Sequence, residues 1–206
     1  HPSVLDMNDP VVYEEVFHAG KFAGVFQFMN TGMQRLGSSA KVSSIEEIAT
    51  VSAIFRPGPL SAGVDKMYVQ AKEGSEDVEY DHPIIEDVLG KTYGLIVFQE
   101  DIMNLVNVLG HKITMSDANV LRKLLTKKGL SGAKMKKKKD LYDRFVKGCQ
   151  NKGMSFADAK VLWGKMEYFS GYGFSKNHAI PYSIISYQCA WLQTYYQDEW
   201  ISAFLD

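Results

Sequence analysis

The sequence is poor in cysteine and in long apolar runs, and each shortage excludes a class of protein. Among 206 residues there are two cysteines, Cys149 and Cys189, and neither belongs to a CxxC or Cys/His cluster. A disulfide-stabilised scaffold and a zinc ribbon are therefore excluded, and two free thiols fit a reducing cytoplasm. The longest clean apolar run, residues 95–98, is far shorter than the roughly 20 residues that a membrane span needs.

The common catalytic motifs are missing as well. The chain has no Walker A loop, no Rossmann glycine fingerprint, no GxSxG elbow and no HExxH helix. Glu100 and Asp101 are adjacent acids, but neighbouring helical positions point about 100° apart and no third ligand lies at a suitable spacing. We expect them to be acids in the first turn of a helix, where they favour the helix dipole. No catalytic residue and no metal ligand is assigned in this chain.

What remains is the composition of an ordinary globular protein, with 46% hydrophobic and 23% charged residues. A chain of this length can bury about 70% of the surface that it exposes when unfolded. It opens with His1 and Pro2 rather than Met, and it carries no signal peptide. We therefore expect a piece of a longer, cytoplasmic protein.

Charge is distributed very unevenly, although the net charge is only -1. Residues 110–152 hold 13 Lys and Arg against three Asp, a local charge of +10, and the rest of the chain carries -11. Such segregation within one chain indicates a polyanionic partner for the basic segment. Charge alone leaves open the alternative of a solvated lysine-rich helix that binds nothing.

Apolar residues at helical spacing, interrupted by frequent Gly and Pro residues, predict a mainly α, multi-helical fold with two or three short extended segments. Alternation at residues 24–28 favours a short strand or extended piece. The sequence RPGP at residues 56–59 should stop the helix before it, since neither proline can continue that helix. The helices are expected at residues 10–17, 45–55, 64–72, 83–89, 99–109, 115–126, 133–152, 156–169 and 178–203.

Two groups of basic residues are candidate phosphate ligands. The first lies near the end of one predicted helix, where Arg offers a bidentate fork and Lys a point charge; it comprises Arg122, Lys123, Lys127 and Lys128. The second is denser and projects from a helix whose other face is apolar; it comprises Lys134, Lys136, Lys137, Lys138, Lys139, Arg144 and Lys147. Lysines on flexible stems suit sequence-independent contact with a nucleic-acid backbone. A solvated face is the alternative for both groups.

A glycine-flanked aromatic turn at residues 171–173 brings Lys176 and His178 to the start of the last predicted helix. Free backbone N–H groups and the helix dipole favour an anion at such a start. Tyr182 follows His178 by four residues and therefore lies on the same helical face. A triphosphate could be held by this cluster, and a purely structural histidine is the alternative.

Five segments, in this order, resemble the fingers region of bacterial-type C-family replicative DNA polymerases, the DNA polymerase III alpha subunit. The resemblance extends from about residue 9 to residue 200. Its carriers are GVFQF at 24–28 with GM at 32–33, FRPGPL at 55–60, TYGLIVFQE at 92–100, LRK at 121–123, and residues 169–178 continuing to Tyr182, SYQ at 186–188 and AWL at 190–192.

The resemblance implies template-directed addition of deoxynucleotides to a primer, with Mg²⁺ held by palm aspartates that lie outside this chain. By the same resemblance, the residues facing the triphosphate of the incoming dNTP would be Arg122, Lys123, Lys127, Lys176, His178 and Tyr182. The partners implied are primer–template DNA, the palm and thumb of the same polymerase, and replisome subunits, with no membrane. As an isolated piece, the chain would be an inactive fragment of a nucleotidyltransferase.

The resemblance also implies a functional division of the chain. Residues 1–20 would connect palm to fingers, residues 21–110 would form a first helical part, and residues 111–206 a basic part that includes the nucleotide-facing helix. A free-standing helical protein that binds nucleic acid without sequence preference is the alternative function. A purely structural interaction domain is a third possibility, against which the basic segment argues.

Overall fold

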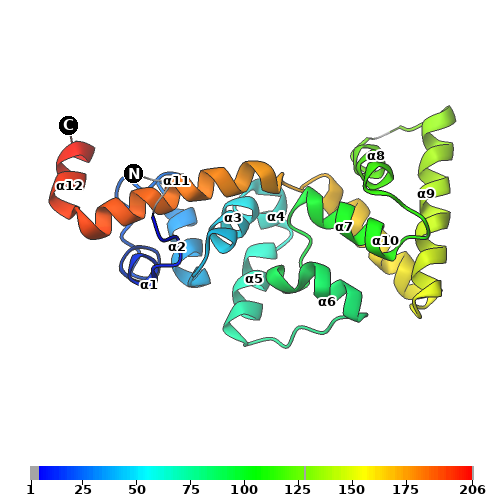
Figure 1. The fold of residues 1–206 in the computed structure, drawn as a ribbon, viewed down its shortest axis with the longest axis horizontal. Coiled ribbons are helices and arrows are strands. Elements are labelled where there is room, and N and C mark those ends of the chain that lie inside the picture. The colour runs from blue at the N-terminus through cyan, green and yellow to red at the C-terminus, as the bar shows by residue number, and fades with distance from the viewer. Residues whose placement is uncertain (1–4, 128, 206) are drawn as a thin grey trace. The chain divides into compact units, whose positions relative to one another are not determined.

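The computed structural model describes residues 5–127 and 129–205 (Figure 1). Within these residues all regular structure is helical, apart from one isolated bridge between Phe98 and Phe174. The mainly α fold class predicted from the sequence is therefore confirmed. In the same described part of the chain, no helix is both long and apolar enough to cross a membrane.

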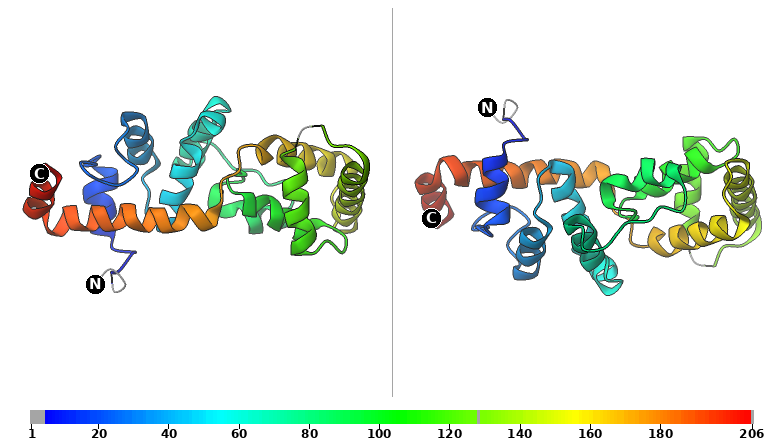
Figure 2. Two further views of the ribbon diagram at one scale, coloured as in Figure 1. Left: turned by 90° about the horizontal axis from the view of Figure 1, so that it is seen from above. Right: turned by 90° about the horizontal axis from the view of Figure 1, so that it is seen from below.

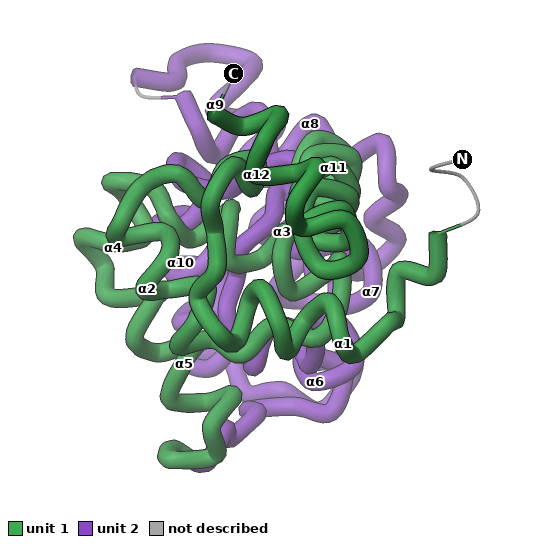
Figure 3. The backbone as a smooth tube through the Cα atoms, turned by 90° about the vertical axis from the view of Figure 1, so that its left-hand side faces the viewer, with its two compact units in different colours: residues 1–76, 176–206 green, residues 77–175 purple. Residues whose placement is uncertain are grey.

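Contacts between Cα atoms divide the chain into two compact units, which Figure 3 shows in two colours. Unit 1 comprises His1–Glu76 and Lys176–Asp206, and unit 2 comprises Asp77–Ser175. This division rests on contacts alone, and the three-part functional division of the chain stays a prediction.

Some helices of unit 1 begin where the sequence predicts them. The Ser44 side chain accepts a hydrogen bond from the Glu47 N–H and so caps α3. Pro57 stands at the first position of α4, where its missing N–H costs nothing. The helices of the unit are α1 (Pro10–Val12), η2 (Tyr13–His18), α2 (Thr31–Ala40), α3 (Ile45–Ile54), α4 (Pro57–Ser61), α5 (Val64–Glu73), α11 (Lys176–Tyr195) and α12 (Gln197–Leu205).

The core of unit 1 lies where α11 packs along α3 and η2 (Figures 1 and 2). Tyr13 and Tyr187 are buried there with ring centroids 5.3 Å apart, and Phe17 meets Phe28 at 5.4 Å. The Tyr187 hydroxyl donates to the Asp6 carbonyl at 2.7 Å, which satisfies a polar group that burial would otherwise leave unpaired. Aromatic packing thus fixes α11 in its unit.

Four segments of unit 1 differ from what the sequence predicts. Helices α2 (Thr31–Ala40) and α4 (Pro57–Ser61) were not predicted. Residues 24–28 form consecutive turns rather than a strand, because Gly24 and Gln27 take positive φ values of 73° and 65° and the chain reverses. The single helix expected at 178–203 is two helices, since α11 ends at Tyr195 and α12 begins at Gln197.

Unit 2 holds the basic segment on two of its helices. Thr114 and Asp117 form a capping box at the start of α8, and Ser155 caps α10. The helices are α6 (Pro83–Leu89), η3 (Gly90–Thr92), α7 (Gln99–Leu109), α8 (Met115–Leu125), α9 (Gly132–Asn151) and α10 (Phe156–Ser170).

Helix α7 lies at the centre of unit 2 and contacts α6, α8, α9 and α10. Leu105, Phe145 and Trp163 are buried members of the shared core. Burial of each such side chain contributes roughly 1.5–3 kcal/mol. The core therefore holds α8 and α9, which carry the basic residues, on one rigid base.

Candidate nucleic-acid interface

Arg122, in the last turn of α8, is held by two neutral amide side chains. Its Nε and Nη2 donate to Asn119 Oδ1 at 3.2 and 3.0 Å, and its Nη1 donates to Gln99 Oε1 at 2.6 Å. Neither acceptor is charged, and no carboxylate pairs with Arg122 among the described residues. The guanidinium is therefore oriented without being neutralised, as a phosphate ligand would need.

Lys123 directly follows Arg122, Lys127 lies five residues after it, and both lysines are exposed. Neither forms an ion pair with another residue that the structure describes. A lysine at the C-terminal end of a helix also interacts favourably with the helix dipole, so the position of Lys123 has a structural explanation too. Lys128, the fourth member of the predicted group, lies outside the described residues.

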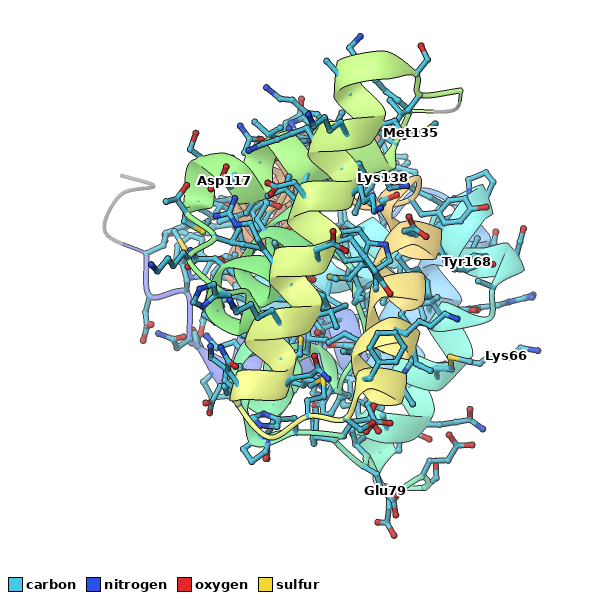
Figure 4. The ribbon with its side chains drawn as sticks, turned by 90° about the vertical axis from the view of Figure 1, so that its right-hand side faces the viewer. Lys66, Glu79, Asp117, Met135, Lys138 and Tyr168 are labelled. Carbon is cyan, nitrogen blue, oxygen red and sulfur yellow. The ribbon has the colours of Figure 1, made fainter. Side chains whose placement is uncertain are left out.

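Some basic residues of the second group are engaged in ion pairs that link helices. Lys137 of α9 donates to Asp117 of α8 at 3.2 Å, and Lys138 pairs with Glu167 of α10 at 2.6 Å. Arg144 lies 3.3 Å from the same Asp117. Figure 4 shows Lys138 directed from α9 towards α10, with Asp117 on the other side of α9. These three cations hold α9 against its neighbours, and their charges are partly neutralised.

Lys136, Lys139 and Lys147 form a separate set, called here the lysine stripe. Together with Asp143 they follow one another at intervals of three and four residues, so they lie along one face of α9. All three lysines are exposed, and in the described part of the chain none has an ion-pair partner. Lys134 is also exposed, but two helical positions differ by about 200°, so it lies on a different side from Lys136.

The loop before α8 experiences the positive potential of this region. Partial desolvation lowers the pKa of the His111 imidazole, and nearby cations lower it further; these are Lys147, Lys112, Arg144 and Lys152. The pKa of Asp117 also lies below its ordinary value. Desolvation raises it, but hydrogen bonds from the Lys137 side chain and the Thr114 backbone lower it by more. The contributions of the cations to both shifts indicate a surface where negative charge is favoured.

The start of α11, in unit 1, carries the remaining predicted residues. Lys176 is the first residue of the helix. The His178 and Tyr182 rings lie 4.3 Å apart, which confirms that they share a helical face. Tyr182 in turn meets Phe26 at 5.5 Å, and both of these rings are 37% exposed. Phe26 was not among the candidate residues, because its contact with Tyr182 joins positions far apart in sequence.

The acids at the start of α7 are occupied by hydrogen bonds. Asp101 Oδ2 accepts from the backbone N–H groups of Val97 and Phe98 at 3.0 and 2.7 Å, and Glu100 accepts from the Ser175 hydroxyl at 3.3 Å. Both are first-turn acids, as the sequence predicts. Across residues 5–127 and 129–205, no group of three or more His, Cys, Asp and Glu is placed to hold a metal ion.

Comparisons with known proteins give one consistent family. Residues 1–153 match the model of the bacterial DNA polymerase III alpha subunit finger domain. The chain is 37% identical over 201 residues to the DNA polymerase III subunit alpha of Campylobacter jejuni, which covers 98% of this chain and 16% of that protein. The subunit alpha of Aquifex aeolicus is 37% identical over 199 residues, which cover 96% of this chain and 16% of that protein. The subunit alpha of Chlamydia pneumoniae is 34% identical over 203 residues, which cover 98% of this chain and 16% of that protein. The chain thus spans about 16% of the length of these relatives.

Proposed function

The chain belongs to the bacterial DNA polymerase III alpha subunit finger domain family, and we propose that it serves as the fingers module of a replicative DNA polymerase. In this role it binds the triphosphate of the incoming dNTP and the backbone of primer–template DNA. The observation that carries the proposal is Arg122, whose charge is oriented by amides and left without a carboxylate partner.

The chemical contribution of such a module is electrostatic. Donors that are fixed before the reaction stabilise the negative charge that develops on a transferring phosphoryl group, and they need no reorganisation when it develops. Arg122, Lys123 and Lys127 are the proposed donors in unit 2, and Lys176 and His178 are separately proposed as phosphate ligands in unit 1. By the family resemblance, Mg²⁺ would be held by palm aspartates that lie outside this chain.

The lysine stripe is the proposed contact with the DNA backbone. Replacing two of its members, Lys136→Ser with Lys139→Ser, should weaken binding of every duplex sequence to a similar extent. Because each lost phosphate contact removes about 0.9 from the log–log dependence of affinity on salt, the slope should fall by about 2. The measurement is fluorescence anisotropy of a labelled primer–template duplex titrated with the chain across a salt series.

A matched control removes two exposed lysines that lie outside the stripe, Lys66→Ser with Lys160→Ser. This control should leave the salt slope unchanged. Equal losses in the two double variants would show that net charge alone determines binding. A loss that depends on the duplex sequence would contradict contact with the backbone.

His111 provides an independent test of where the DNA lies. Its pKa is lowered by desolvation and further by the cations around it, so a bound polyanion that offsets those charges should raise it. NMR titration of the imidazole, with and without saturating duplex, measures this shift. A pKa of His111 that stays the same when DNA is bound would place the duplex away from the C-terminal half of α9.

The sign of the effect of His111 on stability follows from the same shift. Because the folded pKa is lowered, the unfolded chain binds a proton on this group more readily. The free energy of unfolding should therefore fall as pH drops below the ordinary histidine range, and His111→Gln should reduce that dependence. Urea unfolding at several pH values checks the prediction.

A further inference from the structure

Gln99, the first residue of α7, contacts both Arg122 and the segment that leads towards α11. Its Oε1 accepts from Arg122 Nη1 at 2.6 Å, and its Nε2 donates to the Gly173 carbonyl at 3.0 Å. Its backbone N–H donates to the Phe174 carbonyl at 2.8 Å. Gln99 therefore makes one hydrogen bond to the proposed phosphate ligand and two to the segment formed by Gly173 and Phe174.

The position of Gln99 is fixed by the core of unit 2. The preceding residue, Phe98, is buried and forms the isolated bridge with Phe174. The Asp101 carboxylate accepts from two backbone N–H groups just before Gln99 and so fixes the start of α7. Because the backbone is held on both sides, the side chain of Gln99 can orient Arg122 at little entropic cost.

Gly173 permits the close approach that these hydrogen bonds need. A Cβ atom at this position would lie 3.2 Å from Gln99 Cγ and 3.4 Å from its backbone nitrogen. The first separation is tighter than an ordinary van der Waals contact of a Cβ atom, and the second is at the limit of one. A larger residue would therefore press on the Gln99 side chain. Gly173 stands three residues before Lys176, where α11 begins.

The amide is also the right chemical group for this place. A glutamine side chain accepts and donates at once and adds no charge. A glutamate could accept from Arg122, but it could not donate to the Gly173 carbonyl, and it would neutralise the guanidinium. Each terminal nitrogen of Arg122 carries a second N–H group, and no described residue accepts from these groups. The amide thus orients the cation and leaves donors for a ligand.

We propose that Gln99 is a positioning residue that holds the Arg122 guanidinium for the dNTP triphosphate and ties it to the backbone at Gly173. The inference rests on the proposed function, because it takes the triphosphate as the ligand of Arg122. It adds that Arg122, when it binds phosphate, is linked through the hydrogen bonds of Gln99 to the segment that leads into α11.

The test is a double-mutant cycle in a polymerase that contains this chain as its finger domain. Gln99→Met keeps the length of the side chain but removes both amide hydrogen bonds. It should raise the KM for dNTP roughly tenfold, the effect of losing one hydrogen bond to a charged group, and leave the Kd for primer–template DNA unchanged. In an Arg122→Ala background the same substitution should have no further effect, because its action passes through Arg122.

A second variant keeps the test decisive if Gln99→Met unfolds. Gly173→Ala retains the glutamine but displaces it, so it should raise the KM for dNTP in the same direction, and again only when Arg122 is present. Full additivity with Arg122→Ala for either variant would overturn the inference. An increased KM in Arg122→Ala but not in the Gln99 and Gly173 variants would reject the inference and leave the proposed function standing. No increase in Arg122→Ala itself would reject the proposed function.

Discussion

Arg122→Ala in the intact polymerase should lower kcat/KM for dNTP by about 100- to 1000-fold and leave the Kd for primer–template DNA nearly unchanged. That loss is typical when one preorganised donor to a developing negative charge is removed. Arg122 meets this description, because its Nε, Nη1 and Nη2 are held by the amides of Asn119 and Gln99 while its charge has no carboxylate partner in the described structure. Single-nucleotide incorporation kinetics and duplex anisotropy measure the two quantities.

Arg122→Lys separates charge from geometry at the same site. Lysine keeps the positive charge but lacks the planar fork, so it cannot bind the two amide oxygens and a phosphate in the same way. An intermediate loss in kcat/KM is expected. Unchanged incorporation by Arg122→Ala would contradict the triphosphate role. A different outcome would favour the alternative of a nucleic-acid-binding protein that does not act on nucleotides. In that outcome the chain binds DNA, but nucleotide incorporation depends on none of Arg122, Lys176 and His178.

The helices of this chain could be predicted because their start signals are local. The Ser44 and Thr114 caps and the proline at the start of α6 act on backbone groups within three residues, and the helices that they begin lie where the sequence predicts them. Residues 24–28 were harder, because alternation cannot reveal the positive φ values at Gly24 and Gln27. Local chemistry therefore determined where these helices begin. The sequence did not predict α2 and α4, and positive φ values explain the difference at residues 24–28.

The candidate site was predictable by residue type but not by partner. The sequence indicated a dense cationic segment, yet it could not show that Lys137 and Lys138 pair with acids on α8 and α10. It named Arg122, but not Gln99, which lies 23 residues away and reaches it only in the folded core. Ion pairs and amide contacts between helices depend on tertiary packing, and a single sequence carries no periodic signal for them.

The largest effect on stability is expected at Gly148, a buried residue inside α9. A Cβ atom there would collide with backbone atoms of the connection between α7 and α8, namely the Leu109 carbonyl oxygen, the Gly110 carbonyl carbon and the His111 nitrogen. Backbone atoms cannot rotate away as a flexible side chain can. Gly148→Ala should therefore lower the free energy of unfolding of unit 2 by about 3 kcal/mol or more, the upper range for overpacked cores.

Gly164, in the middle of α10, is the matched control. It is exposed, and an added Cβ atom would meet nothing within 4 Å. In an open helical position alanine is favoured over glycine by roughly 0.5–1 kcal/mol, so Gly164→Ala should stabilise the protein. The same substitution thus has opposite signs at two helical glycines of one unit, and urea unfolding followed by circular dichroism distinguishes them.

The contact at Gly148 also bears on the basic surface. The His111 N–H donates to the Arg144 carbonyl of α9 at 2.9 Å, so the loop and the helix meet where the cations around His111 gather. If Gly148→Ala separates them, the pKa of His111 should rise towards its ordinary value in whatever fraction of the protein stays folded. Two results would contradict this account. Unchanged stability would show that α9 can move away from this loop without cost, and an unchanged pKa of His111 would show that the close packing does not create the positive potential.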